Sequence, residues 1–203
     1  LEIRPADTMT DLDDTVAGRR EVSVLFADLQ GFTAWSEQHP PEEVTAMLNT
    51  HLAVAVPAAV RHGGEVDRII GDAVMVTFNT RGDQPDHPVR AVRAALALQE
   101  ETTRLADAHP GWPRFRVGVD TGPSTVSVLG TRGGRTRTVI GDTVNTAARI
   151  EGQAPPGGVA VGASTLAALP ASARTSSLGP LALKGKARSE EHTSELQSHT
   201  EIS

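Results

Sequence analysis

The order of apolar segments along the chain limits the folds that it can adopt. Some runs are rich in β-branched residues and alternate, as strands do, whereas others repeat their apolar residues at helical spacing. The runs are strand-like at residues 22–27, helical at 39–64, strand-like on both sides of a turn at 65–78, helical at 86–108 and strand-like at 114–130. The turn at Gly71 and Asp72 has the composition of a tight hairpin.

This β-α-β-β-α-β order predicts an α+β fold of the ferredoxin-like type, a palm-type antiparallel sheet covered by helices, with a C-terminal αβ extension. Within residues 114–130 we expect two strands around a turn at Thr121-Gly122-Pro123. The predicted domain spans 20–187, after a polar arm at 1–19. Residues 188–203 are polar without alternation and are expected to be a tail foreign to the domain.

Composition narrows the class of partner. The net charge of −6, with Lys and Arg scattered along the chain, argues against nucleic acid. There is no cysteine, no secretory signal pattern and no apolar run that approaches the roughly 20 residues needed to span a bilayer, so we expect a cytoplasmic protein without a membrane segment. Because the chain begins at Leu1, we expect it to be part of a longer protein with an upstream regulatory domain.

Two acidic residues occupy comparable places in the predicted sheet. Asp28 ends the first strand and Asp72 lies in the hairpin turn, each close to a glycine. Since the first strand and the hairpin are neighbours in a ferredoxin-like sheet, the two carboxylates can converge at one edge. Such an oxygen pair suits two Mg²⁺ or Mn²⁺ ions. The alternative is that both are ordinary turn or capping residues.

The segment after Asp28 is a candidate phosphate seat. Gln30, Gly31, Phe32 and Thr33 lead into a helix, and the first N–H groups of a helix attract anions. Farther along, Asn145 and Arg149 are four residues apart and share a helix face. They could clamp a sugar and a phosphate, or they could simply be solvated; spacing leaves both open.

Several enzyme classes are excluded by missing motifs. The sequence has no G-x-x-x-x-G-K-[ST] phosphate loop, no G-x-S-x-G elbow and no cysteine nucleophile. Its seven histidines show no metal-binding spacing.

Five blocks of the sequence together resemble the class III nucleotidyl cyclase catalytic domain, in particular that of bacterial adenylyl cyclases. They are "VSVLFADLQGFTAWSE", "GGEVDRIIGDAVMVTF", "FRVGVDTGP", "TRTVIGDTVNTAARIE" and "LALKGKA". The resemblance implies conversion of ATP to cyclic AMP and pyrophosphate, by in-line attack of the ribose 3′-oxygen on the α-phosphorus.

The resemblance also implies roles for single residues. Asp28 and Asp72 look like the two metal-holding aspartates, and Asn145 looks like the ribose-orienting amide. Arg149 resembles the arginine that stabilises the transition state, and Lys184 resembles the lysine that binds the terminal phosphates. The family works as head-to-tail dimers with shared sites, so a homodimer is implied.

Two further positions resemble the base-reading pair of the family. Thr138 fits a subgroup that carries Thr where many adenylyl cyclases carry Asp. Arg68 stands where adenylyl cyclases usually have Lys, and its forked guanidinium is not equivalent to an ammonium. Two alternatives therefore stay open: an inactive cyclase-homology module that binds nucleotide and dimerises, and a cyclase that uses GTP.

Overall fold

A computed structural model describes residues 17–131, 134–181 and 191–196. The strands in these residues are β1 (Gly18–Gln30), β2 (Glu65–Ile70), β3 (Ala73–Phe78), β4 (Arg114–Thr131), β5 (Gly134–Ile140), β6 (Val159–Gly162), β7 (Thr175–Leu181) and β8 (Glu191–Leu196). The helices are α1 (Phe32–Ser36), α2 (Pro41–Val60), α3 (His87–Ala108), α4 (Asp142–Glu151) and α5 (Ala163–Ala167).

One sheet contains all of these strands. Its order is β2-β3-β1-β4-β6-β8-β7, and β5 pairs with the end of β4. The central strand β1 is antiparallel to both β3 and β4, whereas β4 and β6 are parallel. The β2–β3 hairpin thus lies beside β1, which confirms the expected α+β arrangement.

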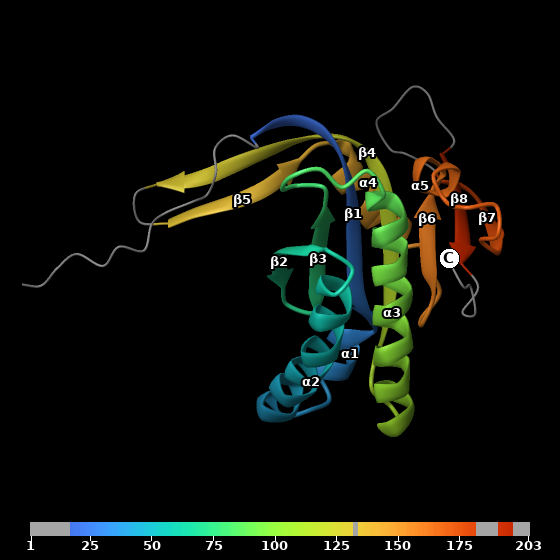
Figure 1. Ribbon diagram of the computed structural model, residues 1–203. Helices are drawn as coiled ribbons and strands as arrows, with labels where there is room; N and C mark the ends of the chain where they lie inside the picture. The colour runs from blue at the N-terminus through green and yellow to red at the C-terminus, as the bar shows by residue number, and fades with distance from the viewer. Residues whose placement is uncertain (1–16, 132–133, 182–190, 197–203) are drawn as a thin grey trace, which may run out of the picture.

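Helices cover the two faces of the sheet unequally. The long helices α2 and α3 lie over one face (Figure 1), where they pack on Leu25, Ala27 and Leu29 of β1. The alternate residues Val22 and Val24 join a second apolar cluster, which includes Ala147 of α4 on the opposite face. The even-numbered residues of β1, including Asp28, therefore belong to the α4 face.

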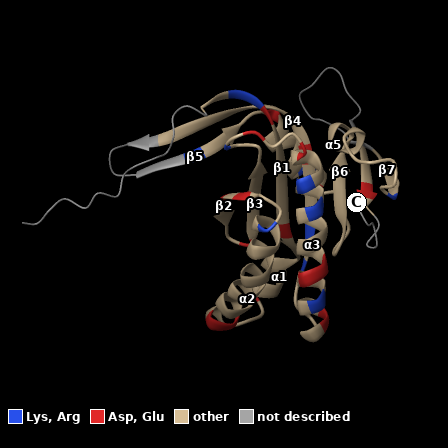
Figure 2. Ribbon diagram, in the orientation of Figure 1, with Lys and Arg blue, Asp and Glu red and all other residues tan. Residues whose placement is uncertain are grey.

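The two long helices differ in their charge. Charged residues of both signs occur along α3, whereas α2 carries charge only in its first turn, at Glu42 and Glu43 (Figure 2). By length and composition alone, α2 is the one helix of the described residues that could cross a membrane. In this fold the helix buries Met47, His51 and Ala55 against the rest of the domain.

The expected turn at Thr121-Gly122-Pro123 is wrong, because β4 runs through it without a break. Gly122 is not in a left-handed conformation. It is needed for space, since a Cβ there would lie 2.9 Å from Oγ1 of Thr143 in α4. Pro123 lies between the stretch of β4 that pairs with β6 and the stretch that pairs with β5, so the ladder tolerates it.

The expected domain ends also need correction. Strand β1 begins at Gly18, so the last residues of the predicted arm belong to the sheet. Glu191–Leu196, expected in a foreign tail, form β8 between β6 and β7. Strand pairing uses backbone groups and does not require apolar side chains. The buried Thr193 hydroxyl is satisfied by the Gly179 carbonyl oxygen at 3.1 Å.

Beyond their pairing with the rest of the sheet, β4 and β5 continue as a hairpin that extends away from the body of the domain (Figure 1). Residues 132 and 133 at its tip lie outside the described residues.

Candidate active site

The structure brings Asp28 and Asp72 together. Asp28 lies near the end of β1, and Asp72 lies in the β2–β3 turn beside that strand. The two carboxyl groups are within hydrogen-bonding reach of each other. Burial, and then repulsion from Asp28, raise the pKa of Asp72 to about 6. A cation between the two carboxylates would relieve this repulsion.

The backbone beside each aspartate is open. Gly31 and Gly71 have positive φ angles of 79° and 62°, and a Cβ at either would meet nothing within 4 Å. No group of three or more His, Cys, Asp or Glu that could hold a metal occurs in the described parts of the chain. The donor set is therefore two carboxylates beside open stretches of backbone, which fits Mg²⁺ or Mn²⁺ completed by water or phosphate oxygens.

A cation that was not predicted stands beside this pair. Arg116 of β4 is the direct strand partner of Asp28, and its Nη2 lies 3.3 Å from the Asp28 Oδ2. Its Nε forms an ion pair with Glu151 at the end of α4. Glu151 is 8% exposed, and burial raises its pKa to about 7 despite Arg116. Arg116 thus links the two aspartates to the end of α4.

A glycine makes this approach of α4 possible. A Cβ at Gly118 of β4 would lie 2.2 Å from the backbone nitrogen of Glu151 and 2.6 Å from the Ala147 carbonyl oxygen. Only a residue without a side chain lets the C-terminal half of α4 lie this close to the sheet. Gly118 therefore places Glu151 within reach of Arg116.

The proposed phosphate seat forms a short helix. Gly31 caps α1 in a left-handed conformation, and Phe32 and Thr33 begin the helix directly after β1. The first N–H groups of such a helix have no partner within it. Gln30 ends β1 and is exposed. This segment follows Asp28 closely enough for both to contact one polyphosphate.

The two expected base-reading positions also meet. Arg68 of β2 donates through Nη2 to Oγ1 of Thr138 in β5. Asp67 joins them, because its Oδ2 accepts from Arg68 Nε at 2.6 Å and from Thr138 Oγ1 at 3.4 Å. Sequence reasoning missed Asp67 as it missed Arg116 and Glu151, since only the strand and helix contacts show them beside the predicted residues.

Asn145 and Arg149 are exposed on one face of α4, as their spacing predicts. Among the described residues, no hydrogen bond or ion pair joins either of them to Asp28 or Asp72. Within one chain the pair on α4 is thus separate from the two aspartates. Lys184 lies outside the described residues.

Residues 16–196 match the family model of the adenylate and guanylate cyclase catalytic domain. The chain belongs to this family. Class III cyclase domains are metal-dependent in general, and their structures imply a nucleotide substrate and a dimer.

Curated relatives of this cyclase domain include adenylate cyclases of bacteria. Adenylate cyclase 1 of Rhizobium meliloti is 36% identical over 152 residues, which cover 73% of this chain and 23% of the relative. The adenylate cyclase of Anabaena cylindrica is 38% identical over 140 residues, 67% of this chain and 28% of that protein. The chain thus spans about a quarter of the length of these two relatives.

Solved structures share the fold along most of the chain. The adenylyl cyclase CyaB from P. aeruginosa is 26% identical with a TM-score of 0.80, covering 88% of this chain and 94% of that one. The guanylate cyclase domain of RhGC from Catenaria anguillulae, in complex with GTP, is 30% identical with a TM-score of 0.80. That match covers 89% of this chain and 98% of the solved one.

Proposed function

We propose that this cyclase domain converts ATP to 3′,5′-cyclic AMP and pyrophosphate. The observation that carries the proposal is the Asp28–Asp72 pair with Arg116 beside it, at one end of the central strands. Asp28 and Asp72 would hold two Mg²⁺ or Mn²⁺ ions, which would supply Lewis-acid activation of the phosphate and of the 3′-oxygen. The N–H groups of residues 31–33, with Arg116, would hold the phosphates.

We further propose that the site is completed by a second copy of the chain. Asn145 and Arg149 are exposed and make no contact with the aspartates of their own chain, which favours a partner as the place where they act. Asn145 would orient the ribose and Arg149 would stabilise charge that develops on the phosphate. Lys184 would bind the terminal phosphates. Such a head-to-tail homodimer would contain two equivalent sites.

The same second copy would read the base. In the proposed orientation, Arg68 donates to ring N1 of adenine and Thr138 faces the amino group at C6. The chemistry forms one bond, from the 3′-oxygen to the α-phosphorus, and breaks the bond to pyrophosphate. The 3′-hydroxyl proton is released. Because the solved relatives include a guanylate cyclase domain, GTP is the competing substrate for any test.

The test is product formation by the full chain from ATP and from GTP, each with Mn²⁺ and with Mg²⁺, followed by chromatography. We expect cyclic AMP from ATP, and loss of at least about 100-fold in Asp28→Ala. Asp83→Ala is the matched control, since it removes an exposed acid in the loop after β3 and should leave turnover unchanged. No product from either nucleotide, in a folded dimer, would instead favour the regulatory module.

A further inference from the structure

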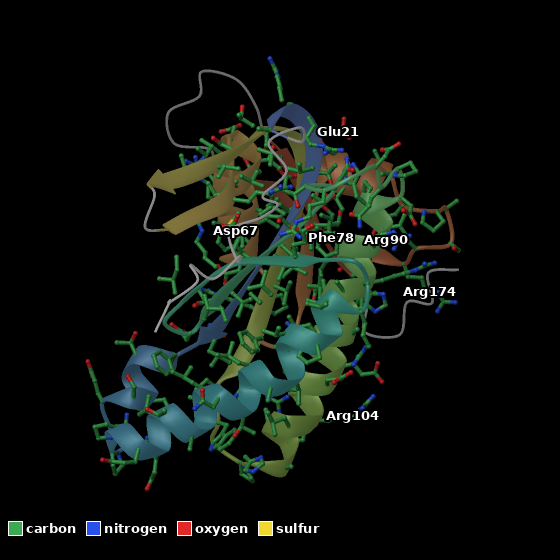
Figure 3. All side chains as sticks on the ribbon, turned by 60° about the vertical axis from the view of Figure 1, so that its left-hand side comes forward. Glu21, Asp67, Phe78, Arg90, Arg104 and Arg174 are labelled. Carbon is green, nitrogen blue, oxygen red and sulfur yellow. The ribbon has the colours of Figure 1, made fainter. Side chains whose placement is uncertain are left out.

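The cluster of Asp67, Arg68 and Thr138 contains one residue with no role so far. Asp67 lies on β2, on the side of the sheet from which the β4–β5 hairpin extends (Figure 3). Its side chain is only 3% exposed, whereas that of Arg68 is 44% exposed. A buried acid that contacts both base-reading side chains is placed to control how they present their hydrogen bonds.

A β-bulge creates this arrangement. The pairing of β2 with β3 shifts between Val66 and Arg68, so that Asp67 is the extra residue of β2. In a regular strand, neighbouring side chains point to opposite faces. Here the Asp67 carboxylate and the Arg68 guanidinium meet at 2.6 Å, and such a bulge is a known way to redirect a side chain near a site.

The carboxylate fixes the direction of the hydroxyl. An ionised carboxylate can only accept hydrogen bonds, so the proton of the Thr138 hydroxyl must point to Asp67 Oδ2, at 3.4 Å. Arg68 can only donate, and it occupies one lone pair of the Thr138 oxygen. What Thr138 has left for a nucleotide is one lone pair. It can accept a hydrogen bond and cannot donate one.

We propose that Asp67 is a positioning residue that makes the site select adenine over guanine, by holding the Thr138 hydroxyl as an acceptor and Arg68 as a donor. Adenine carries an amino donor at C6 and an acceptor at N1, which match this pair. Guanine carries an acceptor oxygen at C6 and a proton on N1. The Thr138 acceptor would then face an acceptor, and the Arg68 donor would face a donor. This inference rests on the base orientation in the proposed function.

The experiment measures kcat/KM for ATP divided by kcat/KM for GTP in Asp67→Asn. The new amide can donate to the Thr138 oxygen, which frees the hydroxyl proton to point to the base. We expect the ratio to fall about tenfold or more. Glu65→Gln is the matched control, because it removes the same charge from the same strand at a residue that pairs with Arg81 at 3.0 Å. Its ratio should stay at the wild-type value.

A double substitution tests whether Asp67 acts through the Thr138 hydroxyl. In a Thr138→Val background, where no hydroxyl can be turned, Asp67→Asn should leave the ratio unchanged. An unchanged ratio in Asp67→Asn alone would overturn the inference, and so would an equal fall with and without the hydroxyl. If Asp67→Asn fails to fold by circular dichroism, Asp67→Ala replaces it in both backgrounds, because it also removes the acceptor that holds the Thr138 hydroxyl proton, and the same fall in the ratio is expected only where the hydroxyl is present.

The inference can be tested even if the proposed function is wrong. When the wild-type chain forms no cyclic nucleotide, the same variants are compared by the ratio of dissociation constants for ATP and GTP, measured by calorimetry with Mn²⁺. A preference for ATP that Asp67→Asn removes would support the inference without catalysis. Equal binding of both nucleotides by the wild type, or binding of neither, would overturn it.

Discussion

At the scale of single residues, the site concentrates acids that one arginine does not neutralise. Asp28 and Glu151 pair with Arg116, and Asp72 lies beside Asp28, yet the pKa values of Asp72 and Glu151 are raised to about 6 and about 7. In both cases burial is the first cause, and neighbouring carboxylates add to it. The metal-free domain therefore carries a free-energy cost near neutral pH, which binding of a cation would offset.

The first prediction at this scale concerns Asp72→Asn. Because the folded-state pKa of Asp72 lies above its ordinary value of 3.8, the folded domain loses stability as pH rises from about 4 to about 6. The amide removes that loss, so the metal-free variant should be more stable than wild type at pH 7.5, by about 1–2 kcal/mol. It should also lose turnover. Urea unfolding in a chelator, at pH 7.5 and at pH 4, measures the effect.

The gain should disappear at pH 4, where the wild-type carboxyl is largely protonated in the folded state. A gain of equal size at both pH values would show that charge is not its cause. The metal supplies the complementary test: Mn²⁺ should raise the melting temperature of the wild type at pH 7.5 and should do so less at pH 5. It should have little effect on Asp72→Asn.

How far single site residues can be predicted from sequence depends on how local their signal is. Asp28 follows an apolar strand run and stands three residues before Gly31, and Asp72 directly follows Gly71 in the hairpin turn, so both positions could be predicted from the sequence. Their proximity followed from the strand order. Arg116, Glu151 and Asp67 have no such signal. Arg116 is identified only by its register opposite Asp28, and Asp67 only by a bulge. Register and bulges depend on tertiary pairing.

At the scale of elements, a close contact with β4 holds α4 on the sheet. Most elements were predictable because their periodicity or turn chemistry is local: the β2–β3 hairpin and the helices α2 and α3 are examples. The errors have a common origin. Gly122-Pro123 looks like a turn and β8 looks like a tail, but neighbouring elements that are remote in sequence stabilise both as strands.

The prediction at this scale is that Gly118→Ala destabilises the domain by several kcal/mol, on the order of 3 kcal/mol. The added methyl group would overlap the backbone of α4 at 2.2 Å, and backbone cannot move aside as a flexible side chain can. Gly152→Ala is the control at the other side of the same contact. It has φ of −59° and its nearest neighbour would be 3.4 Å away.

Urea unfolding of both variants, followed by circular dichroism, gives the comparison. Gly152→Ala should unfold within about 0.5 kcal/mol of the wild type. If Gly118→Ala were equally stable, α4 would not lie as close to β4 as described, and the placement of Glu151 beside Arg116 would have to be revised.

At the scale of the whole molecule, one chain carries two sets of candidate site residues that do not meet. The aspartates with Arg116 lie at one end of the central strands, and the exposed pair Asn145 and Arg149 lies on α4. A second copy related by two-fold symmetry would bring each half to the other twice. The sequence could suggest this only through the family resemblance, because nothing in a linear pattern shows which chain supplies which side chain.

The last prediction tests this division of labour by mixing two inactive variants. A heterodimer of Asp28→Ala and Arg149→Ala would contain one site with both defects and one site with none. Random mixing of equal amounts should then restore about one quarter of wild-type cyclic AMP formation. Mixing Asp28→Ala with Asp72→Ala is the matched control: both defects fall in the same half, so every heterodimer site stays damaged and activity should stay absent. If heterodimers form, as shown by co-purification of two tags, and the first mixture is as inactive as the second, then Asp28 and Arg149 act within one chain and the shared site is wrong.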